Sequence, residues 1–225
     1  MRAALVLLVM AALGGPLMHA HAQELRITPV DEGAGDVTWR RFKARLVAAI
    51  EKRDTRFLLS ILEPDVRNQT DGGRGVAEFR RQWELDAPDT PLWRELGSTL
   101  QLGAAFVKRE KGVELCAPYL LGKWPPDVDP FDHGAIVARE TMVQAEPSTA
   151  APVLGTLSYH VARVVDWEVA DKAADAKQKW VRIQFREGEG YVPEEHVRSP
   201  IEQVACFVKT PAGWKMSAFA PAGGD

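Results

Sequence analysis

The spacing of hydrophobic residues changes about halfway along the chain. Over residues 37–52 the apolar side chains Trp39, Phe42, Leu46 and Ile50 recur every three or four positions, with charged residues between them. This spacing predicts an amphipathic helix with one buried stripe. Beyond residue 102 the helical spacing is lost, and short runs of strand type take its place. The pattern therefore predicts helices first and strands afterwards.

Three further helical pieces are expected before residue 102. The stretches TRFLLSILE, GVAEFRRQWEL and LWRELGSTLQL each carry an apolar stripe. Asp54 can cap the first of them, and Thr90 followed by Pro91 can begin the third. Because TDGGRG and DAPDTP between them are turn sequences, we expect separate helices within a mainly helical segment 37–102.

The following stretch, AAFVKREKGVELCAPYL, is typical of a hairpin that turns near Glu110-Lys111-Gly112. The segment GKWPPDVDPFDH is then rich in Pro and Asp, which favours a domain boundary near residue 132. Residues 23–132 are therefore predicted to form an α+β domain of about four helices and a hairpin.

Short strand-like runs dominate residues 133–199. In KWVRIQF, the apolar Val181, Ile183 and Phe185 alternate with the outward positions of a half-buried strand. The charged EVADKAADAKQK is interpreted as a long loop. Several short strands close together predict a small β-barrel, because curling a sheet limits its exposed edges. The expected strands are 135–138, 141–145, 152–156, 161–167, 180–185 and 190–192.

The motifs VQAEPSTAAPVLGTLSYHVARVV, KWVRIQF and GEGYVPEEHV together resemble the bacterial Src-homology-3-like domain of exported cell-envelope proteins. The chain departs from that pattern at Gln144, at Glu146 and near Tyr159-His160. The resemblance implies a small all-β barrel that serves as a binding module. The matching residues are Pro147, Ser148, Val153, Leu154, Gly155, Leu157, Trp180, Gly190, Tyr191 and Val192.

The last segment, residues 200–225, is predicted to form a second hairpin around Thr210-Pro211-Ala212-Gly213. It either extends the barrel sheet or returns to pair with strands 104–108 and 113–119. The return would make the barrel an insertion in an α+β domain similar to the cystatin-like, nuclear-transport-factor-type fold. A bridge between Cys116 and Cys206 would favour this second arrangement.

The first residues have the composition of a signal peptide. Arg2 precedes an apolar run, 3–13, which is shorter than the roughly 20 residues that a membrane span needs. Gly14-Gly15-Pro16 and then Ala20-His21-Ala22 follow, so cleavage is expected after residue 22. Removing 22 of the 225 residues leaves a chain of 203 that begins at Gln23. We therefore expect a periplasmic or secreted protein.

The charge of the chain excludes one class of partner. The formal net charge is −3, and loss of Arg2 with the signal peptide makes it −4. A mildly acidic protein lacks the electrostatic basis for nonspecific nucleic-acid binding. No second apolar run reaches spanning length, so no membrane span is expected. A cell-wall component or an envelope protein is the expected partner.

The two cysteines, Cys116 and Cys206, would lie in a compartment that permits disulfides. A bridge would close a loop of about 90 residues and stabilise the fold by roughly 4.5 kcal/mol in the chain-entropy model. The polarity patterns disagree about it, because Cys206 shares a face with Val204 whereas Cys116 shares one with Glu114. Two unpaired thiols are the alternative. A nucleophilic Cys116 is not favoured, since no helix begins there to lower its pKa.

The chain shows no recognisable catalytic or metal motif. Asp127, Asp129, Asp132 and His133 offer alternating oxygen donors that could hold Ca²⁺, but the Gly turn and terminal Glu of the calcium loop are missing. Solvated linker residues are the simpler interpretation. No nucleophile elbow, metalloprotease helix or phosphate loop occurs either. We predict no catalytic residue, metal or cofactor; a non-enzymatic function is favoured, and enzymatic activity stays open as the alternative.

Aromatic residues are the remaining means of recognition. Tyr159, Trp180 and Tyr191 could line a groove of the barrel, where flat rings give contact area at small entropic cost. The alternative is that these rings pack in the core or at its rim. The sequence thus favours a non-enzymatic envelope protein that binds a peptide, glycan or protein partner. A hydrolase with an unrecognised α+β site and a purely structural subunit are the other hypotheses.

Overall fold

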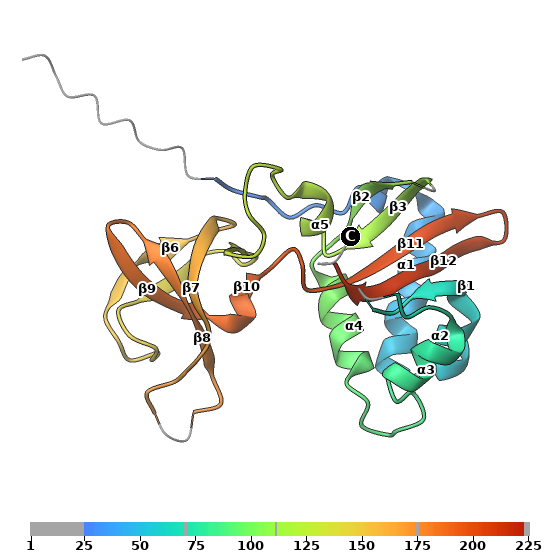
Figure 1. Ribbon diagram of the computed structural model, residues 1–225, viewed down its shortest axis with the longest axis horizontal. Coiled ribbons are helices and arrows are strands. Elements are labelled where there is room, and N and C mark those ends of the chain that lie inside the picture. The colour runs from blue at the N-terminus through green and yellow to red at the C-terminus, as the bar shows by residue number, and fades with distance from the viewer. Residues whose placement is uncertain (1–24, 70–71, 111, 174–175, 223–225) are drawn as a thin grey trace, which may run out of the picture.

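The computed structural model describes residues 25–222 except 70–71, 111 and 174–175, and the predicted signal peptide lies outside these residues. It contains two sheets, one of five strands and one of seven. Figure 1 shows them as two units side by side, with the helices gathered on the five-stranded sheet. We call them the helical unit and the strand-rich unit. The chain is therefore of mixed α+β class, with most of its later part in strands.

Five α-helices belong to the helical unit. Asp36 caps the first by accepting hydrogen bonds from the backbone N–H groups of Thr38 at 2.7 Å and Trp39 at 3.4 Å. Asp54 caps the second, as predicted, through the N–H of Phe57 at 2.9 Å. The helices are α1 (Val37–Lys52), α2 (Thr55–Ile61), α3 (Val76–Gln82), α4 (Leu92–Gln101) and α5 (Leu120–Lys123), and a 3-10 turn, η1 (Glu32–Gly35), precedes them.

The five-stranded sheet has the order β1-β12-β11-β3-β2. Its strands are β1 (Leu62–Arg67), β2 (Ala105–Arg109), β3 (Gly112–Ala117), β11 (Gln203–Thr210) and β12 (Gly213–Pro221). The C-terminal hairpin returns to this sheet, since β11 pairs antiparallel with β3 and β12 pairs parallel with β1. Of the two placements considered for the hairpin, the structure shows this one, and the strand-rich unit is inserted between β3 and β11.

Strand β1 corrects the expectation of helix through residue 63. The helical stretch ends at Ile61, and Leu62 pairs with Met216 at the edge of the sheet. Pro64 is tolerated there because an edge strand can leave one side without ladder hydrogen bonds. Leu62 and Val66 still point into the core, so the burial of these apolar residues is satisfied by a strand.

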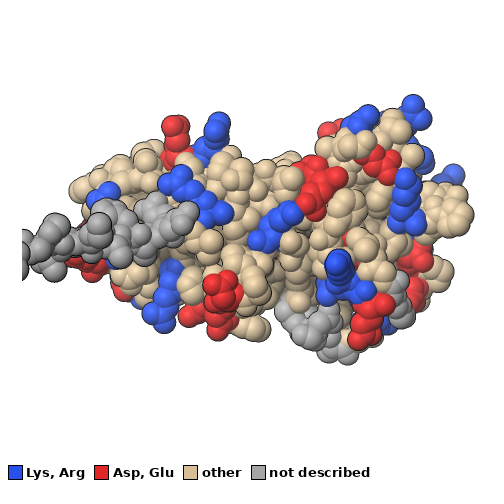
Figure 2. Space-filling model, turned by 90° about the horizontal axis from the view of Figure 1, so that it is seen from above, with Lys and Arg blue, Asp and Glu red and all other residues tan. Residues whose placement is uncertain are grey.

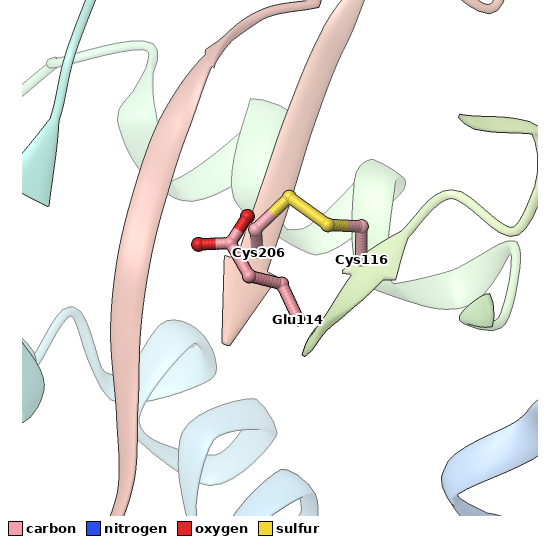
Figure 3. Close-up of side chains that lie close together, drawn as sticks. All are labelled: Glu114, Cys116 and Cys206. Carbon is pink, nitrogen blue, oxygen red and sulfur yellow. A yellow bond between two sulfur atoms is a disulfide. The ribbon is translucent and has the colours of Figure 1, made fainter. Parts of the chain in front are cut away.

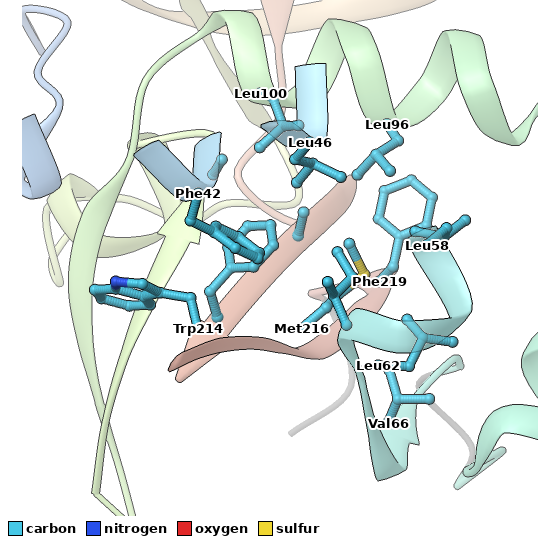
Figure 4. Close-up of a cluster of buried hydrophobic side chains, with 14 of the residues drawn as sticks. Phe42, Leu46, Leu58, Leu62, Val66, Leu96, Leu100, Trp214, Met216 and Phe219 are labelled. Atoms are coloured by element: carbon cyan, nitrogen blue, oxygen red, sulfur yellow. The ribbon is translucent and has the colours of Figure 1, made fainter. Parts of the chain in front are cut away.

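The core of the helical unit lies between the helices and one face of the sheet (Figure 4). It is rich in large rings. The indole of Trp39 lies 5.1 Å from the ring of Phe207 and 5.0 Å from that of Trp214, in edge-on arrangements. Such pairs add about 0.5–1.5 kcal/mol each beyond the burial of their area. The stripe predicted on residues 37–52 is thus confirmed as core.

The strand-rich unit is built on a sheet of order β10-β4-β7-β8-β9-β5-β6. Its main core holds eight buried residues, all Val, Ile or Leu. The sheet curls but does not close, because the outer strands β10 and β6 form no ladder with each other within the described residues. The strands are β4 (His133–Ile136), β5 (Thr141–Gln144), β6 (Val153–Leu157), β7 (Val161–Ala170), β8 (Lys179–Phe185), β9 (Gly188–Pro193) and β10 (Val197–Arg198), with a 3-10 turn, η2 (Glu194–His196).

The two units meet at a buried junction around Tyr119. Its hydroxyl donates to the carbonyl of Ile27 at 2.9 Å, and burial raises its pKa to about 12. The segment around Ile27 also pairs with the strand-rich unit, because its N–H donates to the carbonyl of Tyr159 at 2.8 Å. Apolar residues from both units, including Leu120 and Ala135, complete this junction.

No helix among the described residues is long and apolar enough to cross a membrane.

Candidate functional site

The three predicted binding aromatics do not form a common groove. Trp180 is only 1% exposed, and its indole N–H donates to Asp171 in the β7–β8 connection at 2.8 Å. The expectation of an open aromatic rim is therefore wrong for Trp180. Alternation along β8 is confirmed, since Val181 and Ile183 enter the core. Trp180 lies on the opposite face and is nevertheless buried, which the alternation pattern cannot indicate.

Tyr159 and Tyr191 are half-buried and lie on different elements. Tyr191 sits in β9, opposite Arg182 of β8 and Gln144 of β5. Tyr159 lies in the turn between β6 and β7, with a positive φ of 61°, and its carbonyl holds the N-terminal segment. These positions make Tyr159 a residue of the junction between the units.

The acidic linker residues make local contacts. Asp132 lies 2.5 Å from Nδ1 of His133 and 3.5 Å from Arg163. Asp129 accepts a hydrogen bond from the N–H of Phe131 at 2.9 Å. Each of these carboxylates is thus engaged in shaping the entry into β4.

Cys116 and Cys206 are joined by a disulfide on the outer face of the five-stranded sheet, directly across from each other on β3 and β11 (Figure 3). The composition of this outer face explains why the polarity patterns around the two cysteines disagree. Around the bridge it is apolar, with Val204 and Ala218, whereas one step along β3 it carries Glu114. Glu114 and the two sulfurs lie within 4.8 Å of one another, but sulfurs bonded to each other cannot act as thiolate ligands to a metal.

Glu114 lies at the base of a cavity of about 570 Å³ on this outer face. Its side chain is 9% exposed, and one oxygen accepts from Arg67 at 2.6 Å. Nε of Arg109 lies 3.6 Å from that same oxygen, and the other oxygen accepts from the hydroxyl of Ser217 at 2.6 Å. Both oxygens are occupied by the protein itself, so this carboxylate acts as a tie between strands.

A larger cleft, of about 860 Å³, lies between α4 and the strand-rich unit. Arg94, Ser98 and Gln101 form its helical wall, because spacings of four and three place them on one face of α4. The opposite wall consists of η2, β10 and the segment that leads back to the first sheet. Both units contribute residues to this cleft, which makes it the best candidate for a binding site.

Hydrogen bonds around Arg198 hold the two walls in place. Its guanidinium donates to Glu202 at 2.8 Å and reaches Ser98 on α4 at 3.4 Å. Glu202 also accepts from the N–H of Ser199 at 3.0 Å, while the hydroxyl of Ser199 donates to the carbonyl of Pro130 at 3.3 Å. Burial raises the pKa of Glu202 despite these contacts. These hydrogen bonds therefore order the wall of the cleft at the point where the chain passes from one unit to the other.

Two aromatic residues line the cleft. Phe131 is 71% exposed, an unusual position for a phenyl ring, and Trp167 packs partly on the strand-rich core. The sequence offered one signal for this site, which is a lone Phe in the acidic segment DVDPFDHG. The other contacts depend on residues such as Ser98 and Arg198, which are 100 positions apart. No local pattern brings those two together.

Elsewhere, charge is mixed. Figure 2 shows Lys and Arg interspersed with Asp and Glu on the face seen from above, without a continuous basic surface on that side.

Comparison of the chain with protein-family models, curated proteins and solved structures finds no significant match.

Proposed function

We propose that the protein is an exported, non-enzymatic binding protein of the cell envelope, and that its peptide, glycan or protein partner binds in the cleft between α4 and the strand-rich unit. The observation that carries this proposal is the cleft itself, with walls from both units and the exposed ring of Phe131 between them. Exposed aromatic rings beside a concave surface are typical of recognition sites.

Export is supported by two independent features. The chain carries an apolar stretch with a signal-peptidase pattern at its start. Its two cysteines are bonded to each other, as is usual in oxidising compartments. For the inserted unit we propose a module of the bacterial Src-homology-3-like type, on the motifs quoted above. The curled sheet of short strands is compatible with it.

Binding accounts for the cleft better than catalysis does. Burial raises the pKa of Glu202 in the cleft, which is sometimes a mark of a general acid. Here, however, one of its oxygens accepts from Ser199 and the other from Arg198. A carboxylate that is engaged in this way orders the chain, and the hydroxyl of Ser199 beside it is likewise engaged, since it donates to the carbonyl of Pro130.

Sedimentation with purified cell-wall sacculi tests the wall as partner. The mature protein is expected to sediment with them, and Phe131→Ala is expected to weaken binding by about 1–3 kcal/mol, the scale of one interfacial aromatic. Phe106→Ala is the matched control, because Phe106 is 48% exposed on β2 and does not line the cleft. Equal loss in both variants would contradict binding in the cleft, and absence of sedimentation would exclude the wall.

A further inference from the structure

We infer that the partner enters this cleft as a short extended peptide segment that carries lysine or arginine side chains. The inference rests on the proposed function and specifies the chemistry of its ligand. Three features of the cleft carry it: the balance of charge on its walls, the exposed ring at its side and its size.

The cleft has an excess of negative charge. Its two arginines are already paired within the protein, Arg198 with Glu202 at 2.8 Å and Arg94 with Glu95 at 3.0 Å. These two pairs leave three further carboxylates on the wall of the strand-rich unit. They are Glu168 on β7 and Glu194 and Glu195 on η2.

One of these three carboxylates has an ion-pair partner within the protein, but that pair is exposed to solvent and does not remove the excess of negative charge. Glu168 lies 3.1 Å from Lys179, but their side chains are 68% and 51% exposed. Ion pairs of that kind contribute little, so a cation of the partner can replace the lysine at small cost. Glu194 and Glu195 are consecutive in one 3-10 turn and both line the cleft, so two more negative charges lie on this wall and attract a cation of the partner.

The ring of Phe131 suits the same ligand. Lys and Arg lay their apolar stems along hydrophobic surface while the charged end reaches for carboxylates. A cation above an aromatic face gains about 0.5–1 kcal/mol more at an exposed site. Phe131 and the three glutamates line one cleft, so a basic peptide bound there can contact both the ring and the carboxylates.

The volume of the cleft limits the partner to a short stretch of chain. About 860 Å³ lies within the range of small-ligand sites, roughly 300–1,000 Å³, and holds a few residues and no folded domain. An extended segment with basic side chains at intervals can follow the groove between α4 and η2.

Fluorescence anisotropy with labelled nonapeptides tests this inference on the mature protein. One probe alternates lysine with alanine around a central leucine, and its counterpart has glutamate in place of lysine. We expect the basic peptide to bind at least about tenfold more tightly, a difference of about 1.4 kcal/mol. Its affinity should fall as salt is added, because salt screens partly exposed charges.

Matched variants locate the effect. The double variant Glu194→Gln and Glu195→Gln is expected to lose most of the preference for the basic peptide. The control, Glu51→Gln with Glu187→Gln, removes two exposed carboxylates that do not line the cleft and should keep the preference. Equal loss in both pairs would overturn the inference, because the effect would then be one of net charge.

The outcomes separate this inference from the proposed function. Tighter binding of the acidic peptide, reduced by Phe131→Ala, would overturn the basic ligand and leave the cleft as a binding site. If neither peptide binds, the inference fails, while cross-linking from residue 131 to an envelope component would still uphold the proposed function.

Discussion

The helical unit and the strand-rich unit are stabilised by different kinds of interaction. The helical unit packs rings such as Trp39 and Phe207 between its helices and sheet, and a disulfide closes the outer face of that sheet. The strand-rich unit encloses only Val, Ile and Leu in its main core. Smaller side chains bury less apolar area, so that core contributes less to folding per residue. We infer that the helical unit is the more stable of the two, and that the stability of the strand-rich unit depends more on individual contacts outside its main core.

Removal of the disulfide should have the largest effect. The bridge joins residues 90 positions apart on the two strands that flank the inserted unit. The double variant Cys116→Ala with Cys206→Ala is expected to lower the free energy of unfolding of the helical unit by about 4.5 kcal/mol, because the unfolded chain regains the freedom of a long loop. Urea unfolding followed by circular dichroism measures this. Reduction of the native protein is the control, and a loss below about 1 kcal/mol in both would contradict this role.

Trp180→Ala should destabilise the strand-rich unit by about 3–5 kcal/mol, the usual cost of truncating a buried tryptophan. The indole is 1% exposed and holds the β7–β8 connection through Asp171. Tyr191→Ala is the comparison, since that side chain is half-buried and its loss should cost less. Denaturant midpoints and partner affinity are measured on the same proteins. Normal stability with weakened binding would return Trp180 to the binding surface.

The junction predicts a smaller effect. Tyr119→Phe removes the hydroxyl that donates to Ile27 and leaves a buried carbonyl without that partner, which costs about 1–3 kcal/mol. Because this contact joins the units, calorimetry should show their transitions moving apart. Tyr159→Phe is the control, because Tyr159 contacts Ile27 through its backbone carbonyl, which accepts from the Ile27 N–H and is kept in this variant. Coincident, unchanged transitions in Tyr119→Phe would contradict the anchoring role.

The smallest expected effects concern the pH dependence of stability, to which Asp36 and Glu202 contribute with opposite signs. Hydrogen bonds from Lys209 and Thr38 hold the pKa of Asp36 well below its usual range, so its stabilising contribution is present at neutral pH and is lost on acidification through its folded pKa. Burial raises the pKa of Glu202, so the folded state binds that proton more tightly, and stability from this group is lost as pH rises from its ordinary value of 4.5 through the folded pKa.

Melting temperatures between about pH 2 and pH 7 separate these two effects. Asp36→Asn should flatten the loss of stability in acid, and Glu202→Gln should remove the loss as pH rises above the usual Glu range. A melting profile that is identical to that of the native protein in either variant would exclude the corresponding group.

Local patterns predicted the parts of the fold whose interactions are local. Helix α1 follows the spacing of its apolar stripe, and the Asp54 cap lies three residues from the N–H group that it accepts. Strand β1 was missed because its apolar residues continue a helical run and its partner, β12, lies at the other end of the chain. The burial of Trp180 depends on a connection that no alternation pattern describes. The cleft was missed because its walls come from α4 in the helical unit and η2 in the inserted strand-rich unit. No local pattern indicates that these two distant segments face each other.

Photo-cross-linking from residue 131 tests the central claim most directly. Benzoylphenylalanine replaces Phe131 in one variant and Phe106 in the other, so that two exposed phenyl positions are compared in the cells that produce the protein. If the cleft binds the partner, irradiation will give a discrete adduct from position 131 and none of the same mass from position 106. Digestion of the adduct by a protease or a muramidase then identifies it as protein or wall. Identical adducts from both positions, or adducts from position 106 alone, would contradict binding in the cleft.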